Sequence, residues 1–184
     1  MKRSLLLALV CVTPTALWAQ LGELQVGAIA SYGMRDPYRA GGGLVLGVAP
    51  GRLVYVGLRW ISYSGATTGG SANVTNRAQV FATDFDVQIP LRGGVLEMRP
   101  SIGLGMVQFV QRGSGTTGPV SGYSKEFFAA PGVALQLSAD RIALIPELQY
   151  YFTGHSELTW PVHNKGLAFS VRLVFLSEIR RIRR

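Results

Sequence analysis

The most constraining feature of this sequence is an alternation of apolar and polar side chains with a period of two residues. Phe81 and Phe85 fall on one face of an extended chain, whereas Asp84 and Asp86 fall on the other. The clearest examples are residues 80–89, 95–111 and 142–153. Alternation over eight or more residues predicts β-strands whose two faces meet different environments.

Eight segments alternate in this way, and the connections between them differ in length. The predicted strands are residues 23–34, 41–49, 53–64, 78–90, 95–112, 125–138, 142–153 and 166–176. Tight turns are expected at residues 50–52, 91–94 and 139–141, and longer polar loops at residues 35–40, 65–77, 113–124 and 154–165. An even strand number, with short turns on one rim and long loops on the other, predicts an all-β fold: a closed, eight-stranded, antiparallel, up-and-down transmembrane β-barrel.

The polar faces of the strands indicate whether such a barrel lies in water or in lipid. A soluble barrel or sandwich points polar side chains outward, and its surface would be rich in lysine and glutamate. The strands here contain hardly any lysine, and many polar-face positions hold small residues, which suit a crowded barrel interior. These are Gly27, Gly33, Gly43, Gly47, Gly103, Gly105, Ala130, Gly132 and Ala134. We therefore favour the membrane barrel and keep the soluble barrel as the alternative.

The N-terminus has the features of a secretory signal peptide. Lys2 and Arg3 precede an apolar run over residues 5–12, and Ala19 provides a small residue for cleavage. The run is shorter than the about 20 residues that a membrane helix needs. The single cysteine, Cys11, lies within it, so the mature chain is expected to have neither a disulfide nor a cysteine metal site.

The last predicted strand carries the most specific pattern. Leu167, Phe169, Val171, Leu173 and Phe175 alternate with small or polar residues up to a final aromatic. This strand resembles the C-terminal recognition strand of bacterial outer-membrane proteins. The mature chain as a whole is similar to the small eight-stranded barrels of the OmpA, OmpX and porin-like families. The resemblance implies an outer-membrane location and a strand that the barrel assembly machinery reads.

The chain departs from this resemblance after Phe175. Nine residues follow it, four of them arginines, whereas members of these families usually stop at the aromatic. We divide the chain into a signal peptide over residues 1–19, a barrel domain over residues 20–176 and a basic periplasmic tail over residues 177–184. The tail is expected to be a solvated extension; the alternative is a tether to anionic head groups or to a periplasmic partner.

Seven charged residues are expected to point into the barrel. They are Arg59, Asp84, Asp86, Glu97, Arg99, Glu147 and Arg172. Buried charges are tolerated when they are paired, so we predict a salt-bridge network that plugs the lumen. The alternative is a narrow passive channel lined by both signs of charge, which the small radius of eight strands disfavours.

Cations also predominate in the expected outer loops. They are Arg35, Arg39, Arg77, Arg112, Lys125 and Lys165. The net charge of the whole chain is +8, and it is +6 once Lys2 and Arg3 are removed with the signal peptide. Arginine and lysine pair well with phosphate, so we expect contacts with lipopolysaccharide. Nucleic acid is not an expected partner because an exported protein seldom meets it. The other expected partners are outer-membrane lipid and the barrel assembly machinery, and we expect a monomer without a cofactor.

Two further sets of residues bear on the membrane boundary and on strand regularity. Aromatic side chains suited to the lipid interface are Tyr32, Trp60, Phe127, Tyr150, Phe152 and Trp160. Three prolines, Pro100, Pro131 and Pro146, fall within strands on the outward face. Each proline lacks a backbone donor, so irregularities in the ladder are expected beside them.

One expected loop holds residue types that occur in catalytic sites. His155, Ser156 and Glu157 are adjacent in it, and His163 follows. Some small outer-membrane barrels modify lipid A with such residues, but neighbours on a loop seldom align a nucleophile with its base. In the lipid A deacylases a residue separates the histidine and serine on a strand, which is not so here. We therefore expect no enzyme and no metal site, and a lipid A-modifying enzyme is the least favoured alternative.

Overall fold

The computed structural model describes residues 22–51, 53–68, 73–92, 95–115, 118–158 and 162–178. The predicted signal peptide, residues 1–19, and residues 179–184 of the predicted tail lie outside the described residues. Within the described part, no helix is long and apolar enough to cross a membrane. The regular structure of this part consists of β-strands.

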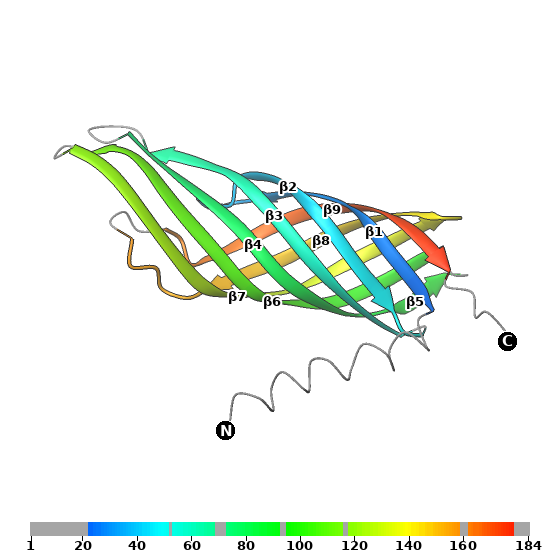
Figure 1. Cartoon of the computed structure of the whole chain (residues 1–184). Helices are drawn as coiled ribbons and strands as arrows, with labels where there is room; N and C mark the ends of the chain where they lie inside the picture. The colour runs from blue at the N-terminus through cyan, green and yellow to red at the C-terminus, as the bar shows by residue number, and fades with distance from the viewer. Residues whose placement is uncertain are drawn as a thin grey trace, which may run out of the picture.

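The strands form a closed antiparallel sheet (Figure 1). They are β1 (Glu23–Gly33), β2 (Ala40–Ala49), β3 (Val54–Thr68), β4 (Asn73–Val87), β5 (Ile89–Arg92), β6 (Leu96–Gly115), β7 (Gly118–Ala139), β8 (Ile142–Thr153) and β9 (Lys165–Glu178). Neighbours along the chain pair with each other, and β1 pairs with β9. The short β5 continues β4 beyond Gln88 and also pairs with β6. The eight-stranded up-and-down barrel predicted from the sequence is confirmed, with β5 as one extra strand.

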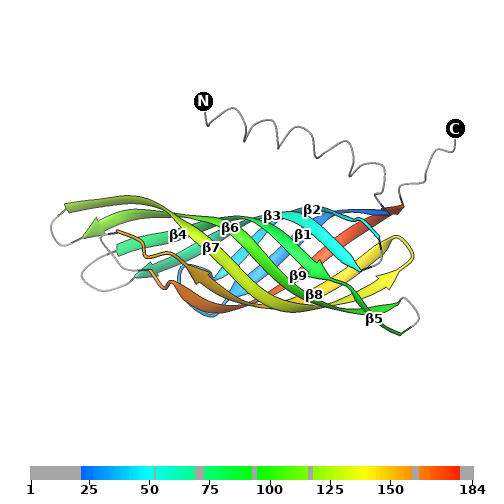
Figure 2. The same cartoon turned by 90° about the horizontal axis from the view of Figure 1, so that it is seen from below.

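The two rims of the barrel differ, as both views show (Figures 1 and 2). The start of β1 and the end of β9 lie at one rim, where β7 and β8 are joined by the turn Asp140-Arg141. Asp140 adopts a positive φ of 54°, a conformation that aspartate tolerates better than most residues. The hairpins β3–β4 and β6–β7 extend farthest at the opposite rim, which we call the distal rim.

The predicted loops over residues 65–77 and 113–124 are wrong in extent. β3 runs to Thr68 and β4 begins at Asn73, while the β6–β7 ladder continues to the pair Gly115–Gly118. At 22 residues, β7 has about twice the 9–11 residues that a tilted strand needs to cross a bilayer. Composition misled the prediction because a ladder beyond the lipid needs no apolar face, so strand pairing continues through glycine, serine and threonine.

Exposure alternates along the strands, with apolar side chains outward. Leu58 is 60% exposed and Leu173 is 55% exposed, whereas the neighbouring Arg59 and Arg172 are buried. Among the aromatic residues expected at the interface, Tyr32, Trp60, Phe127, Tyr150 and Phe152 are exposed, and Trp160 lies outside the described residues. A soluble barrel has the opposite arrangement, so this outer surface matches a hydrocarbon solvent.

Two of the three prolines predicted to lie within strands, Pro131 and Pro146, coincide with gaps in the ladder between β7 and β8. Pro131 lies in a gap between the pairs Ala129–Phe152 and Gly132–Gln149 of β7 and β8. Pro146 lies in the next gap of the same ladder, whereas the β6–β7 register passes Pro100 and Pro131 without a shift. The missing N–H group therefore interrupts pairing locally, and the register on both sides of each gap is the same.

Candidate functional site

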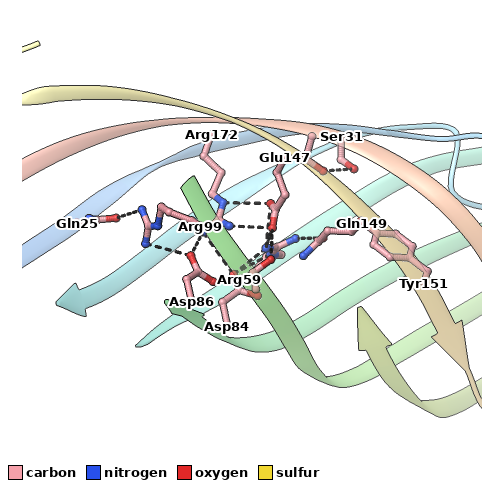
Figure 3. A network of polar contacts seen from close by, with 12 residues as sticks. Gln25, Ser31, Arg59, Asp84, Asp86, Arg99, Glu147, Gln149, Tyr151 and Arg172 are labelled. Atoms are coloured by element: carbon pink, nitrogen blue, oxygen red, sulfur yellow. Dashed lines mark hydrogen bonds and ion pairs between the residues drawn. The ribbon is translucent and has the colours of Figure 1, made fainter. Parts of the chain in front are cut away.

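Six charged side chains meet inside the barrel, and we call them the lumen network (Figure 3). It consists of Arg59 on β3, Asp84 and Asp86 on β4, Arg99 on β6, Glu147 on β8 and Arg172 on β9. Each lies on the inward face of its strand, so charged side chains from five different strands point into the same part of the lumen. Three guanidiniums and three carboxylates make the network neutral.

Glu147 is the shared acceptor of the network. Its Oε1 accepts hydrogen bonds from Arg59 Nη2 at 3.0 Å and from Arg172 Nη2 at 2.8 Å, and its Oε2 accepts from Arg172 Nε at 3.2 Å. Arg59 Nε also donates to Asp84 Oδ2 at 2.9 Å, and Arg59 Nη1 donates to Gln149. Because guanidinium and carboxylate meet at two points, these contacts fix orientation as well as charge.

Arg99 forms the other end of the network. Its Nη2 lies 3.0 Å from Asp86 Oδ2, and its Nη1 donates to Gln136 Oε1 at 2.5 Å. The guanidinium lies 4.5 Å from the centroid of the Tyr55 ring, within the range of a cation–π contact. Arg172 Nη1 lies 3.6 Å from Asp86 Oδ2 and thereby joins the two ends.

Glu97, the seventh predicted member, lies apart from the network. It is half-buried near the start of β6, and within the described residues no cation lies within ion-pair distance of it. Its position is in phase with the lumen, but it is next to the rim that holds the short turns. Its Oε2 is buried and accepts no hydrogen bond from the described residues.

A cluster of aromatic rings fills the lumen on the distal side of the network, and we call it the aromatic plug. It consists of Tyr38, Tyr63, Phe109, Phe128 and Tyr151, all buried. Tyr38 comes from the connection between β1 and β2, and its ring centroid lies 5.4 Å from that of Tyr63 and 5.3 Å from that of Tyr151. The Tyr63 and Tyr151 hydroxyls are 2.7 Å apart. Paired charges thus occupy the lumen at one level, and packed rings occupy it farther along.

Sequence reasoning missed Tyr55 and the aromatic plug. The signal for Tyr55, Tyr63 and Tyr151 was present, since each is an even number of residues from a predicted lumen charge on its own strand. Tyr38 had no such signal because its connection has no strand period, and only the fold brings it inside.

Gly57 makes room for Tyr55, and this gives a prediction. A Cβ at Gly57 would approach Tyr55 Cε1 to 2.8 Å, so the Gly57→Ala variant must displace the ring that lies beneath Arg99. We expect it to lower the free energy of unfolding in detergent micelles by about 1–3 kcal/mol, a typical cost of overpacking. Gly42→Ala is the matched control, because its Cβ meets nothing closer than 3.9 Å. Equal stabilities of the two variants would contradict this packing.

The six predicted outer cations occupy two kinds of position. Arg35 and Arg39 lie in the β1–β2 connection, and Lys165 begins β9. Arg39 Nε donates to Asp36 Oδ1 at 2.6 Å, and this hydrogen bond raises the pKa of Arg39. Arg77, Arg112 and Lys125 were counted with the outer-loop cations, Arg77 inside a predicted loop and the other two at the ends of predicted strands. All three lie within β4, β6 and β7, because these strands extend beyond the apolar band. All three are exposed on the outward face.

The predicted catalytic candidates do not form a nucleophile and base pair. Ser156 is buried, whereas His155 and Glu157 on either side are exposed. Within the described residues, no hydrogen bond joins Ser156 to His155 or His163. The described part also contains no group of three side chains able to hold a metal ion.

No protein-family model and no curated protein sequence matches the chain. Solved structures do match, and the following three each cover 85% of this chain. A major outer-membrane protein from Thermus thermophilus is 13% identical, with a TM-score of 0.67 and 99% of that chain covered. The N-terminal β-barrel domain of OprF from Pseudomonas aeruginosa is 11% identical, with a TM-score of 0.60 and 98% covered. Ail from Yersinia pestis, solved with the heparin analogue sucrose octasulfate, is 13% identical, with a TM-score of 0.54 and 99% covered.

These similarities and the closed barrel define the class of fold. The chain has the fold of the small, eight-stranded outer-membrane β-barrels. At these identities the likeness extends to the fold, and function must be argued from the chain's own residues.

Proposed function

We propose that this chain is an integral outer-membrane β-barrel with a structural or interaction role and a lumen that does not conduct solutes. The observation that carries the proposal is the lumen network, in which Arg59 binds Glu147 across the barrel and Arg172 binds it from the neighbouring strand. The aromatic plug closes the same lumen at a second level. An eight-stranded barrel has space for little more than its own side chains, and here polar and aromatic groups occupy it.

The outward apolar surface supports the membrane location. Leu46, Leu58, Phe81, Leu104 and Leu173 are exposed on β2, β3, β4, β6 and β9, respectively. An exposed apolar surface of this kind destabilises a protein in water but is stable in lipid, where a closed barrel also satisfies every strand edge. This surface and the fold together support an outer-membrane location.

The distal rim supports an interaction role. β3, β4, β6 and β7 extend beyond the apolar band and carry the exposed cations Arg77, Arg112 and Lys125. In this proposal the distal rim faces outward from the cell, and its cations contact phosphorylated glycolipid of the outer leaflet. Guanidinium groups suit phosphate because they donate two parallel hydrogen bonds.

Planar-bilayer recording tests the closed lumen. We expect the purified barrel to insert without producing discrete conductance steps, because the lumen network and the aromatic plug occupy the lumen at two levels. The change in gel mobility on boiling verifies that the purified barrel is folded, and a known porin in the same bilayer serves as a positive control. Reproducible steps that change in size in the Arg59→Ala variant would overturn the proposal and favour a narrow channel.

A further inference from the structure

The outer surface changes from apolar to polar within two residues on four adjacent strands. Cross-strand pairing aligns Trp60, Phe81, Met106 and Phe127 in one outward row across β3, β4, β6 and β7. The next outward row toward the distal rim is Ser62, Gln79, Gln108 and Lys125. On this side of the barrel, the lipid-facing band therefore ends between these two rows.

A basic groove lies just beyond this boundary. It has a volume of about 380 Å³ and is lined by Ser62, Thr75, Arg77, Gln79, Val110 and Arg112. Arg77 pairs with Val110, and Thr75 pairs with Arg112, so the two arginines are diagonal neighbours on the same face of β4 and β6. Diagonal neighbours are about 7–8 Å apart at Cα, so both guanidiniums can reach one ligand.

The two arginines are uncompensated. Within the described residues, no carboxylate lies within 4.0 Å of Arg77 or Arg112, whereas Arg39 is paired with Asp36. The other polar side chains of the basic groove are hydroxyls and an amide, which donate hydrogen bonds without adding negative charge. The groove is thus built for an anion with several acceptor oxygens, such as a phosphate.

An apolar groove lies on the same strands, on the side of the boundary away from the distal rim. It has a volume of about 410 Å³, and its lining includes Leu44, Leu58, Trp60, Phe81, Leu104 and Met106. The Trp60 and Phe81 rings lie side by side, with centroids 6.5 Å apart. From Phe81 to Arg77 is four residues of strand, or about 13 Å. One amphiphile can therefore reach both grooves, with its anionic head in the basic groove and its tail in the apolar groove.

We infer that these two grooves form a binding site for a phosphorylated glycolipid of the outer leaflet. Arg77 and Arg112 hold a phosphate, and an acyl chain packs against Trp60 and Phe81. A glycolipid fits better than a soluble anion because the basic groove is continuous with the lipid-facing surface. The inference rests on the proposed function, since it requires the distal rim to lie at the outer leaflet.

The test measures binding of defined lipids to the full-length mature barrel assembled in nanodiscs. The probes are bisphosphorylated lipid A, the same lipid without its phosphates, and inorganic phosphate. We expect lipid A to bind tightly and the other two probes to bind at least tenfold more weakly. In the Arg77→Gln/Arg112→Gln variant, lipid A binding should weaken about a hundredfold, or tenfold for each lost charge-assisted contact. Arg112→Gln should weaken it about tenfold.

The control variant Arg141→Gln removes one positive charge, as Arg112→Gln does, from an exposed position outside both grooves. We expect it to bind lipid A as the wild type does. Equal weakening in Arg112→Gln and Arg141→Gln would indicate general charge attraction and overturn the site. So would inorganic phosphate that binds as tightly as lipid A. The gel-mobility shift on boiling distinguishes failure of the proposed function from failure of the glycolipid site. If the wild type does not assemble in lipid, the proposed function fails. If it assembles but the groove variant binds normally, the glycolipid site fails.

Discussion

Replacing Glu147 with glutamine is expected to lower the free energy of unfolding by about 3–5 kcal/mol, the cost of leaving a buried charge without its partner. The variant keeps the volume of the side chain but removes the negative charge that Arg59 and Arg172 share. Two guanidiniums then lie close together in the barrel with only the carboxylates of Asp84 and Asp86 to balance three arginines. Urea unfolding in detergent micelles, followed by tryptophan fluorescence and by gel mobility, measures the loss.

Two further variants make this prediction specific. Glu157→Gln removes an exposed carboxylate and should change stability by no more than about 0.5 kcal/mol. Arg172→Gln combined with Glu147→Gln restores a neutral lumen, so the double variant should be more stable than the sum of the two single losses implies. Strict additivity would show that Glu147 and Arg172 are not coupled, contrary to the hydrogen bonds between them.

Replacing Leu58 with arginine is expected to destabilise the barrel in lipid by about 2–4 kcal/mol, the cost of a cation near the middle of the bilayer. Leu58 is 60% exposed, lies in the centre of the apolar stretch of β3, and pairs with Leu46 and Thr83. For a protein in water, the same change at an exposed position costs about 0.5 kcal/mol or less. The size of the loss therefore distinguishes a membrane barrel from a soluble one.

Leu53→Arg is the matched control for depth. Leu53 is 64% exposed but precedes β3 at the rim of short turns, where the membrane interface is expected. A cation there costs about 0–1 kcal/mol. Reversible unfolding of both variants in lipid vesicles measures the difference. If Leu58→Arg and Leu53→Arg cost the same, Leu58 does not face hydrocarbon, and the membrane location would have to be abandoned.

The features that could be predicted from the sequence are those that follow from apolar–polar alternation with a period of two residues. Alternation of the kind seen around Asp84 and Asp86 is sufficient to assign strands and their inward faces. Eight segments of this kind give the number of strands. It also aimed Arg59, Glu147 and Arg172 into one lumen, because residues in phase on neighbouring strands must share a face. The C-terminal pattern ending at Phe175 lies on β9, the strand that closes the barrel against β1.

The same reasoning failed where water lies on both sides of a strand. Residues 113–124 contain the glycine, serine and threonine typical of loops, yet they lie mostly on β6 and β7. Beyond the lipid, backbone pairing holds the strands together and side chains no longer need to alternate. This error also left Arg77 in a predicted loop and Arg112 at the last residue of a predicted strand, so their common groove could not be foreseen.

The sequence by itself determined the strands, their inward and outward faces, and which charges enter the barrel, since these depend on neighbouring positions of one chain. Only the tertiary structure decided which groups meet. Arg59 reaches Glu147, 88 positions away, because the stagger of the closed sheet sets their height in the lumen. Tyr38 enters the aromatic plug because its connection folds inward over the rim. Arg77 and Arg112 share a groove because the β4–β6 register places them diagonally. Contacts of this kind depend on the closure of the whole barrel, which no local pattern records.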